Sequence, residues 1–512
     1  MRHSKQLKIR CRTARLPLSN GGMRTPIKAV AACILAVCAG CMATKTTTPS
    51  APAPEAPVAG AAGTDWRWVQ GMVFVPTTAV NEAQEWDEYD PAVNDRELHY
   101  ASAYGINVVR VYLHYYVYLK KKTVFLADID DFLNRADKYG IKTEFVFFDD
   151  CWNQPPKELL SADYHYPAPI PGVHNSQWLV CPGDDVRNHY EQHQKGLKSY
   201  VQDIVNAHLA DSRVVFWEIY NEPNKSKETV RLEKDAAIWI KETGTKIPAT
   251  ATDKDFSGGP FSDFVSWHQY GTYDIFGDEH TLCTECMNRQ GQSVPGIVSH
   301  YKGKVGYIMW EFGIGRDNCR FAWGEKRESP RKDEAVTPFH GVVYPDGHPW
   351  ALDDAKALLT PEGYAKTPFF AVSYYRDWLS KDLAKKSVTP MIDFDLGTET
   401  GTGSPDASVG VPKENYSIAY TGEVMAPADG AYTFTVDTDG VLYLTVNGEG
   451  RIMKTLYGRT VTNTTMDLVG NRLFKIAVFY RHGSGPTNLH LSWSGPSFEN
   501  RPLLPSTHPQ GI

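Results

Sequence analysis

The sequence predicts an α/β fold, a (β/α)8 barrel followed by an all-β sandwich, and two patterns support it. Over residues 65–389, β-branched apolar runs alternate with amphipathic segments of helical period. From residue 390 the helical period stops, and short alternating segments are separated by Gly, Asn and Asp. Alternating strands and helices build parallel sheets, whereas closely spaced strands build sandwiches. The 512 residues exceed the usual size of one core, which agrees with two folded domains.

Eight apolar runs in the first region are the predicted barrel strands, in the order Val69–Pro76, Asn107–Leu113, Thr143–Phe148, Val214–Tyr220, Ile247–Thr252, Phe264–Tyr270, Val305–Trp310 and Cys319–Trp323. The helices expected between them are Arg96–Tyr104, Ile129–Tyr139, Tyr190–Ala210, Lys234–Thr243 and Gly296–Tyr301. No G-x-G-x-x-G follows the first strand, which disfavours an open dinucleotide-binding sheet. In a barrel, functional side chains collect at the carboxyl ends of the strands.

The region 390–512 is predicted to be an antiparallel sandwich. Its expected strands are Tyr416–Ala419, Ala431–Val436, Val441–Val446, Arg472–Tyr480 and Leu489–Trp493.

The amino terminus has the pattern of an export signal. Residues 29–40 form an apolar run that is too short to span a bilayer, and Arg24 and Lys28 precede it. The following Ala39-Gly40-Cys41 resembles a bacterial lipobox, so we expect Cys41 to carry the lipid and residues 1–41 to be the signal region, with Met23 as the natural start. The alternative is a secretory signal without lipidation.

Residues 42–64 are rich in Ala, Pro and Thr and are predicted to be a flexible linker. Residues 1–40 hold eight Lys or Arg and no acidic residue, so the remainder is more acidic than the net charge of −7 for the whole chain. An acidic body is repelled by phosphate backbones, which argues against nucleic-acid binding. Cys283 and Cys286 are interpreted as a local disulfide or as two unpaired thiols. We predict no metal site from them, because no second CxxC completes one.

Two glutamates follow apolar predicted strands. Glu222 lies in Asn221-Glu222-Pro223 after the fourth strand, and Glu311 follows the seventh. A carboxylate at the mouth of an apolar strand is costly unless it has a function. Two carboxylates on different strands are the requirement of glycoside hydrolysis, in which one donates a proton and the other attacks the anomeric carbon. The alternative is that each glutamate caps a helix or pairs with an arginine.

The Asn221-Glu222-Pro223 motif with a glutamate on a later strand resembles the clan A retaining glycoside hydrolases, which include the cellulase and mannanase family 5. Three stretches resemble a bacterial cellulase-like subgroup, namely Asp90-Pro91, residues 147–152 and residues 344–347. The resemblance covers roughly residues 65–360. It implies that Glu222 is the acid/base and Glu311 the nucleophile, with carboxyl groups about 5–5.5 Å apart.

The same resemblance implies roles for further residues. Arg110 would orient the nucleophile, His268 and Tyr270 would contact the catalytic pair, and Trp323 on the eighth predicted strand would form the aromatic floor of the sugar site. Asn221 is expected to bind the sugar 2-hydroxyl. Asp149 and Asp150, after the third strand, are expected either to bind sugar hydroxyls or to cap a loop. Trp152 belongs to a set of loop aromatics that are suited to stacking on sugars.

The carboxyl-terminal region resembles the domain first named in anthrax protective antigen, in residues 420–422, 430–434, 437–440, 446–448 and 489–493. Sugar-binding members of that family use two adjacent aspartates and calcium. Here the pair is Thr438-Asp439, so a structural or docking role stays open beside sugar binding.

Together these patterns predict a retaining glycosidase of the bacterial cell envelope that acts on β-linked glycans, with a carbohydrate partner, no cofactor and a membrane anchor at Cys41. Met42 after Cys41 favours the outer membrane, and a periplasmic or secreted protein is the alternative. A surface glycan-binding lipoprotein or adhesin with an inactive barrel is the rival function.

Overall fold

The computed structural model describes residues 63–252, 261–323, 338–396 and 404–507 together with residue 509, apart from residues 346, 455–457, 486 and 497. The predicted signal region and residues 42–62 of the predicted linker lie outside the described residues. Within the described ranges, no helix combines the length and the apolar character that crossing a membrane requires.

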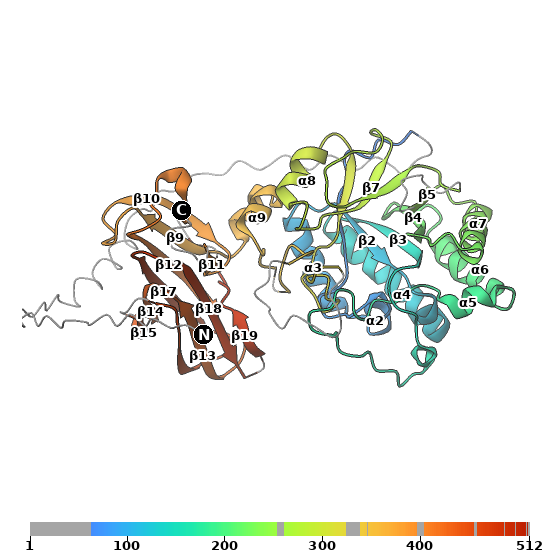
Figure 1. Cartoon of the computed structure of the whole chain (residues 1–512). Helices are drawn as coiled ribbons and strands as arrows, with labels where there is room; N and C mark the ends of the chain where they lie inside the picture. The colour runs from blue at the N-terminus through green and yellow to red at the C-terminus, as the bar shows by residue number, and fades with distance from the viewer. Residues whose placement is uncertain are drawn as a thin grey trace, which may run out of the picture. The chain divides into compact units, whose positions relative to one another are not determined.

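The first folded region is a nearly closed barrel of eight parallel strands (Figure 1). The sheet runs in the order β5-β4-β3-β2-β1-β8-β7-β6, so β1 pairs with both β2 and β8. The strands are β1 (Gln70–Val73), β2 (Val108–Tyr112), β3 (Lys142–Asp149), β4 (Val214–Asn221), β5 (Ala249–Thr252), β6 (Ser266–Gln269), β7 (Leu282–Cys286) and β8 (Gly306–Met309). All eight residues of β4 are buried, as expected for a strand that is covered on both faces.

Helices connect the strands and pack around the barrel (Figure 1). Their starts follow from local sequence. The Asp90 side chain accepts from the amides of Ala92 and Val93 at the start of α3, where Pro91 takes the first helical position. Ser226 caps α7 in the same way through Thr229. The elements are α2 (Glu82–Asp87), α3 (Pro91–Ala103), α4 (Tyr115–Lys138), η1 (Lys157–Leu160), α5 (Asp184–Asn188), α6 (Tyr190–Ala207), α7 (Lys227–Glu242), α8 (Val294–Tyr301), α9 (Leu352–Leu358) and α10 (Pro361–Lys366).

The predicted barrel is confirmed, but the last two strands were assigned to the wrong segments. The first six predicted strands coincide with β1 to β6, whereas the predicted seventh, Val305–Trp310, is β8. The predicted eighth, Cys319–Trp323, contains no strand. The actual seventh strand, β7, has the sequence LCTEC. Thr284 and Glu285 are polar, so β7 lacks the continuous apolar run that marks a buried strand. Both side chains form hydrogen bonds inside the protein.

Side-chain hydroxyls connect β5, β6 and β7, where the barrel closes. The Ser266 hydroxyl lies 2.8 Å from that of Thr250 and 2.6 Å from that of Thr252. Thr252 in turn lies 3.1 Å from the hydroxyl of Thr284 on β7. All four side chains are fully buried. These contacts hold together the two strands at the ends of the sheet order.

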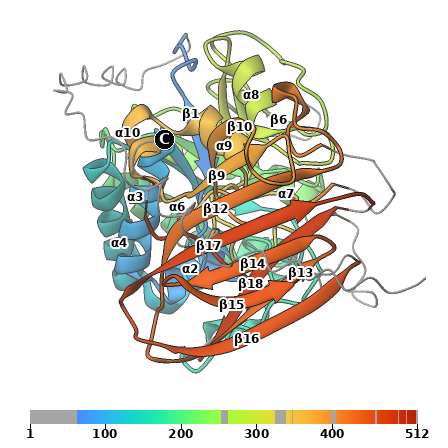
Figure 2. The same ribbon diagram turned by 90° about the vertical axis from the view of Figure 1, so that its left-hand side faces the viewer.

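The second folded region consists of two antiparallel sheets (Figure 2). One has the order β10-β9-β12-β17-β14-β15 and the other β11-β18-β13-β16, with β19 paired to β18. The bounds are β9 (Phe370–Tyr375), β10 (Leu383–Thr389), β11 (Asp393–Asp395), η2 (Ala407–Val409), β12 (Tyr416–Met425), β13 (Gly430–Thr438), β14 (Val441–Val446), β15 (Glu449–Lys454), β16 (Thr460–Leu468), β17 (Leu473–His482), β18 (Asn488–Gly495) and β19 (Phe498–Pro502).

The sandwich begins earlier than the predicted boundary at residue 390. Strand β9 pairs with β12 and β10 pairs with β9, so both belong to the first sheet. The prediction missed β10 because this strand, with the sequence LAKKSVT, carries two lysines and is mostly solvent-accessible. A charged edge strand lacks the apolar alternation of an inner strand, and it also blocks pairing with other chains.

Candidate active site

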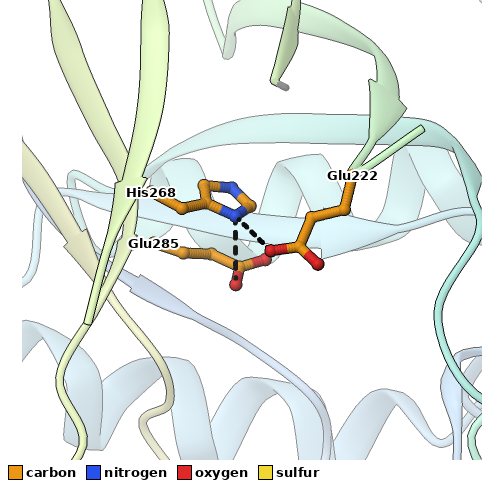
Figure 3. A group of neighbouring side chains, drawn as sticks. All are labelled: Glu222, His268 and Glu285. Atoms are coloured by element: carbon orange, nitrogen blue, oxygen red, sulfur yellow. Dashed lines mark hydrogen bonds and ion pairs between the residues drawn. The ribbon is translucent and has the colours of Figure 1, made fainter. Parts of the chain in front are cut away.

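Glu222, His268 and Glu285 meet at the mouth of the barrel (Figure 3). Glu222 follows β4, His268 is on β6 and Glu285 is on β7. Nδ1 of His268 lies 2.9 Å from Oε1 of Glu222 and 3.5 Å from Oε2 of Glu285. One carboxylate oxygen of Glu222 and one of Glu285 are within 4.8 Å of each other. Burial lowers the pKa of His268, but the charges of Glu285 and Glu222 outweigh it, so the pKa is raised on balance.

The structure therefore brings Glu222 together with Glu285 and not with Glu311, and the prediction that Glu311 follows the seventh strand is wrong. Glu311 comes after β8, where it is 2% exposed and groups with Asp317 and Cys319 instead. The error follows from the strand count, since Val305–Trp310 was taken as the seventh strand. One signal in the sequence pointed to the missing strand. The 34 residues between Tyr270 and Val305 are too many for a single connection in a barrel.

Glu285 is held by two donors from β2 and one from the residue that follows β6. Its Oε1 accepts from Nη1 of Arg110 at 2.8 Å and from the Tyr112 hydroxyl at 3.0 Å. Its Oε2 accepts from the Tyr270 hydroxyl at 2.8 Å. Arg110 and Tyr270 were both predicted to contact the nucleophile, which was then taken to be Glu311, and the structure places both on Glu285. These donors fix the orientation of the carboxylate toward Glu222.

Arg110 is fully buried among three glutamates from different strands. Its Nε and Nη2 each lie 2.8 Å from one oxygen of Glu218, and its Nε also lies 3.1 Å from Glu144. Burial and the neighbouring Glu218 raise the pKa of Glu144 well above its usual range. Burial opposes ionisation of Glu218 as well, but Arg110 and a hydrogen bond with Glu144 lower its pKa overall. These opposite directions favour a proton on Glu144, and Glu218 and Glu285 both bond to the guanidinium.

Asn221 is fixed at both ends of its side-chain amide. Its Oδ1 accepts from Nη2 of Arg110 at 2.9 Å, and its Nδ2 donates to Oδ1 of Asp149 at 2.8 Å. The other oxygen of Asp149 accepts from Nε1 of Trp178 at 2.9 Å. Burial raises the pKa of Asp149 to about 7, although these donors act in the opposite direction. Asp149, predicted either to bind sugar hydroxyls or to cap a loop, is thus used to position Asn221.

Asp150 bonds to the protein and does not face the site. Its carboxylate accepts from the Tyr220 hydroxyl at 2.8 Å, from the amide of Asn224 at 2.9 Å and from the Thr229 hydroxyl at 3.0 Å. It also forms an ion pair with Arg187. Asp150 therefore fixes the loop that carries Glu222, which agrees with the loop-capping alternative and not with sugar binding.

Aromatic side chains border the site. Trp152 and Trp323 are 48% and 45% exposed, which is high for tryptophan, and each packs against His174. Trp323 also lies edge-on to Tyr270, with ring centroids 5.0 Å apart. Trp323 is not on a strand, so its predicted place on the eighth strand is wrong. The tryptophan directly after β8 is Trp310, which is 6% exposed.

Cys151 lies in the site without having been predicted there. Its Sγ is 3.4 Å from Oε2 of Glu222 and 3.8 Å from Nδ2 of Asn221. Its backbone amide donates to Oδ1 of Asp149 at 3.0 Å. Only its place in the run Asp149-Asp150-Cys151-Trp152 after β3 could have indicated this. Among the described residues, none of Cys151, Cys181, Cys283, Cys286 and Cys319 is in a disulfide, so the local disulfide between Cys283 and Cys286 does not form.

The PA14 domain family matches residues 372–502, which span the strands from β9 to β19. In this region Thr438 donates its hydroxyl to the carbonyl of Asn488, so the position of the first aspartate in the calcium-binding pair offers no carboxylate. An anti-sigma factor domain-containing protein is 26% identical over 28% of this chain, with a TM-score of 0.26. This chain covers 51% of that protein, or about half of its length.

Two further solved structures are similar at low identity. The A domain of epithelial adhesin 9 from Candida glabrata, in complex with Galβ1-4GlcNAc, is 11% identical, with a TM-score of 0.23 over 28% of this chain and 93% of that chain. A GH5_18 structure from Streptomyces cattleya, in complex with Manβ1-4GlcNAc, is 11% identical, with a TM-score of 0.38 over 56% of this chain and 78% of that chain. No curated protein matches the chain.

Proposed function

We propose that the barrel is a retaining glycoside hydrolase that cleaves β-linked glycans, with Glu222 as acid/base and Glu285 as nucleophile. The observation that carries this proposal is the approach of their carboxylate oxygens to within 4.8 Å at the ends of β4 and β7. Retaining enzymes hold the two carboxyl groups about 5–5.5 Å apart, whereas inverting enzymes need about 6.5–9.5 Å to admit a water molecule.

In the first step, an oxygen of Glu285 attacks the anomeric carbon and Glu222 donates its proton to the leaving oxygen. Arg110, Tyr112 and Tyr270 keep the attacking carboxylate in place. The amide of Asn221 donates to Asp149 and, more weakly, to Sγ of Cys151, and the sugar 2-hydroxyl would replace the weak sulfur contact as acceptor. The contact with the sugar strengthens as positive charge develops on the sugar ring.

In the second step, Glu222 has lost its proton and acts as a base. It takes a proton from water, the water oxygen attacks the anomeric carbon, and the bond to Glu285 breaks, which gives a product of unchanged anomeric configuration. His268 lies between the two carboxylates, and its raised pKa favours a proton at Nδ1 that is shared with Glu222.

A trapped intermediate tests the assignment of the nucleophile. A 2-deoxy-2-fluoro-β-glycoside with a dinitrophenolate leaving group should add one fluoroglycosyl group to the protein, because the second step is slowed more than the first. Peptide mass spectrometry should locate the label on Glu285. A label on Glu311 would restore the original assignment. An absence of label and of turnover on a screen of aryl glycosides would favour the inactive-barrel, glycan-binding alternative.

Azide rescue tests the acid/base. Glu222→Ala should hydrolyse dinitrophenyl glycosides with accumulation of the intermediate, and azide should restore turnover with formation of a β-glycosyl azide, since azide needs no deprotonation. Glu279→Ala is a matched control, because Glu279 is about half exposed and lies outside the site. Rescue of Glu222→Ala to the opposite anomer would contradict the assignment.

We also propose that the enzyme acts in the bacterial cell envelope, where Cys41 anchors it to a membrane. The apolar run 29–40 and the lipobox-like Ala39-Gly40-Cys41 support this proposal.

A further inference from the structure

A second group of acidic and sulfur side chains is buried near the barrel mouth. Glu311, Asp317 and Cys319 lie on the segment after β8, and one ligand atom from each lies within 4.8 Å of the others. The exposed fractions of the three residues are 2%, 2% and 0%. None of them contacts the catalytic pair in the hydrogen bonds and ion pairs of the described residues.

Within the described residues, hydrogen bonds satisfy the two carboxyl groups only in part. Among the described residues, neither Oε2 of Glu311 nor Oδ2 of Asp317 has a hydrogen-bond partner, although both atoms are buried. Two buried carboxylates side by side are very costly unless a cation or a proton lies between them.

The third member adds a ligand type that calcium and magnesium do not use. Sγ of Cys319 lies 3.0 Å from Nε1 of Trp310 and 2.8 Å from Oδ1 of Asn175. The amide oxygen of Asn175 belongs to the long connection after β3 and is also buried. The group therefore offers two carboxylates, one thiol and one amide oxygen from two different loops.

We propose that Glu311, Asp317 and Cys319 bind one zinc ion, with Oδ1 of Asn175 or a water molecule as the fourth ligand. Zinc accepts thiolate and carboxylate ligands together in a tetrahedral site, whereas calcium and magnesium take oxygen ligands. On binding, the thiol of Cys319 loses its proton to solvent and the sulfur bonds to zinc, so affinity rises with pH. The positive charge of the ion offsets the two carboxylates.

The site would join the loops that follow β3 and β8. Asn318, between two of the ligands, donates from Nδ2 to the carbonyls of Ile170 and Val173 at 2.7 and 3.2 Å. Trp310 donates to the sulfur of Cys319, and its ring packs against that of His340. Zinc would thereby hold Trp310 in position at the border of the catalytic site.

Metal content tests the proposal without any activity measurement, so its failure is distinguishable from failure of the proposed glycosidase function. The purified full chain should be stripped with a chelator, loaded with Zn²⁺ and passed through a desalting column. We expect about one zinc ion per chain by plasma mass spectrometry, and a higher thermal unfolding temperature than that of the stripped protein. A loaded protein with less than about 0.1 zinc per chain would overturn the proposal and favour a proton shared by the two carboxyl groups.

Replacing zinc by Co²⁺ tests whether the sulfur of Cys319 is a ligand. Co²⁺ in place of zinc should give a thiolate-to-cobalt charge-transfer band in the near ultraviolet, which Cys319→Ser removes and Cys151→Ser retains. Cys151 is the matched control because its thiol lies beside the catalytic pair. A band that persists in Cys319→Ser would overturn the assignment.

The catalytic trio is the competing place for a cation, because Glu222, His268 and Glu285 also lie close together. His268→Asn should keep the zinc, and the double variant Glu311→Gln/Asp317→Asn should lose it. The reverse result would move the ion to the catalytic trio and overturn the proposal. The zinc content and cobalt spectrum of the unaltered protein need no variant, so poor folding of a variant would leave the test intact.

Discussion

Arg110 is buried among Glu144, Glu218 and Glu285. The pKa of Glu144 is raised and that of Glu218 is lowered, so we expect the proton on Glu144 and different effects when each residue is converted to glutamine. Glu144→Gln replaces one neutral group by another and should leave kcat/KM within about threefold. Glu218→Gln removes a charged partner of the buried guanidinium and should cost about 3–5 kcal/mol in the free energy of unfolding. Urea denaturation and steady-state kinetics measure both, and equal losses would contradict the assigned proton.

Asp149 is expected to make the free energy of unfolding depend on pH, with a defined sign. Its pKa is raised by burial from 3.8 to about 7, so the folded state binds a proton that the unfolded state releases. The resulting stabilisation is complete below about pH 4 and is lost as the pH rises through 7. Asp149→Asn cannot ionise. From pH 5 to pH 7, its free energy of unfolding should therefore rise by about 2 kcal/mol relative to the unaltered protein.

Urea denaturation at the two pH values checks the prediction for Asp149. Asp137→Asn is the control, because the Asp137 side chain is 47% exposed and pairs with Lys142 at the surface. A difference between Asp149→Asn and the unaltered protein that does not change with pH would contradict the raised pKa.

At the residue level, one of the two proposed catalytic glutamates was predictable and the other was not. Glu222 lies in a motif directly after β4, a strand whose burial is evident from its composition. Glu285 lies inside β7, whose two cysteines and one threonine make the strand difficult to recognise from the sequence. The orientation of its carboxylate depends on hydrogen-bond donors from β2 and from the end of β6. The contacts of Arg110, Asp149 and Asp150 depend on long-range pairing, which local patterns do not report.

At the level of elements, hydroxyl groups connect the two strands at which the barrel closes. Ser266 on β6 contacts Thr250 and Thr252 on β5. Ser266→Ala should remove both contacts, leave buried hydroxyls without a partner and lower the free energy of unfolding by about 1–3 kcal/mol. Ser299→Ala, an exposed residue on α8, should change it by less than about 0.5 kcal/mol. Urea denaturation tests the pair, and equal effects would show that the hydroxyls do not support closure.

Elements with a continuous apolar or amphipathic sequence pattern were predicted. Elements in which polar and apolar residues are mixed were not. Strands β1 to β6 and helices α3, α4, α6, α7 and α8 match the predicted segments, although their ends differ. The sandwich strands β9, β10, β11, β15, β16 and β19 were missed. In β16 most side chains are solvent-accessible, so the strand is specified by its pairing with β13 more than by its own apolar residues.

At the level of the whole molecule, the anchor at Cys41 is the prediction that determines where the enzyme works. Cys41→Ser should move the protein from the membrane fraction to the soluble fraction, since acyl chains would supply the membrane affinity. Fractionation followed by immunoblotting measures this, with Cys38→Ser as the control within the same apolar run. An unchanged distribution of Cys41→Ser would contradict lipidation at this residue.

The contacts of Arg110 with three carboxylates also affect which residues of such a barrel can change during evolution. One guanidinium on β2 receives side chains from β3, β4 and β7, so a change in any of these carboxylates alters the charge felt by the others. Substitutions there are accepted only in matched combinations, which are rare. Exposed aromatics such as Trp152 and Trp323 carry no such dependence. Under the proposed function, selection for a different sugar would therefore change the rim one residue at a time and leave the floor of the barrel as it is.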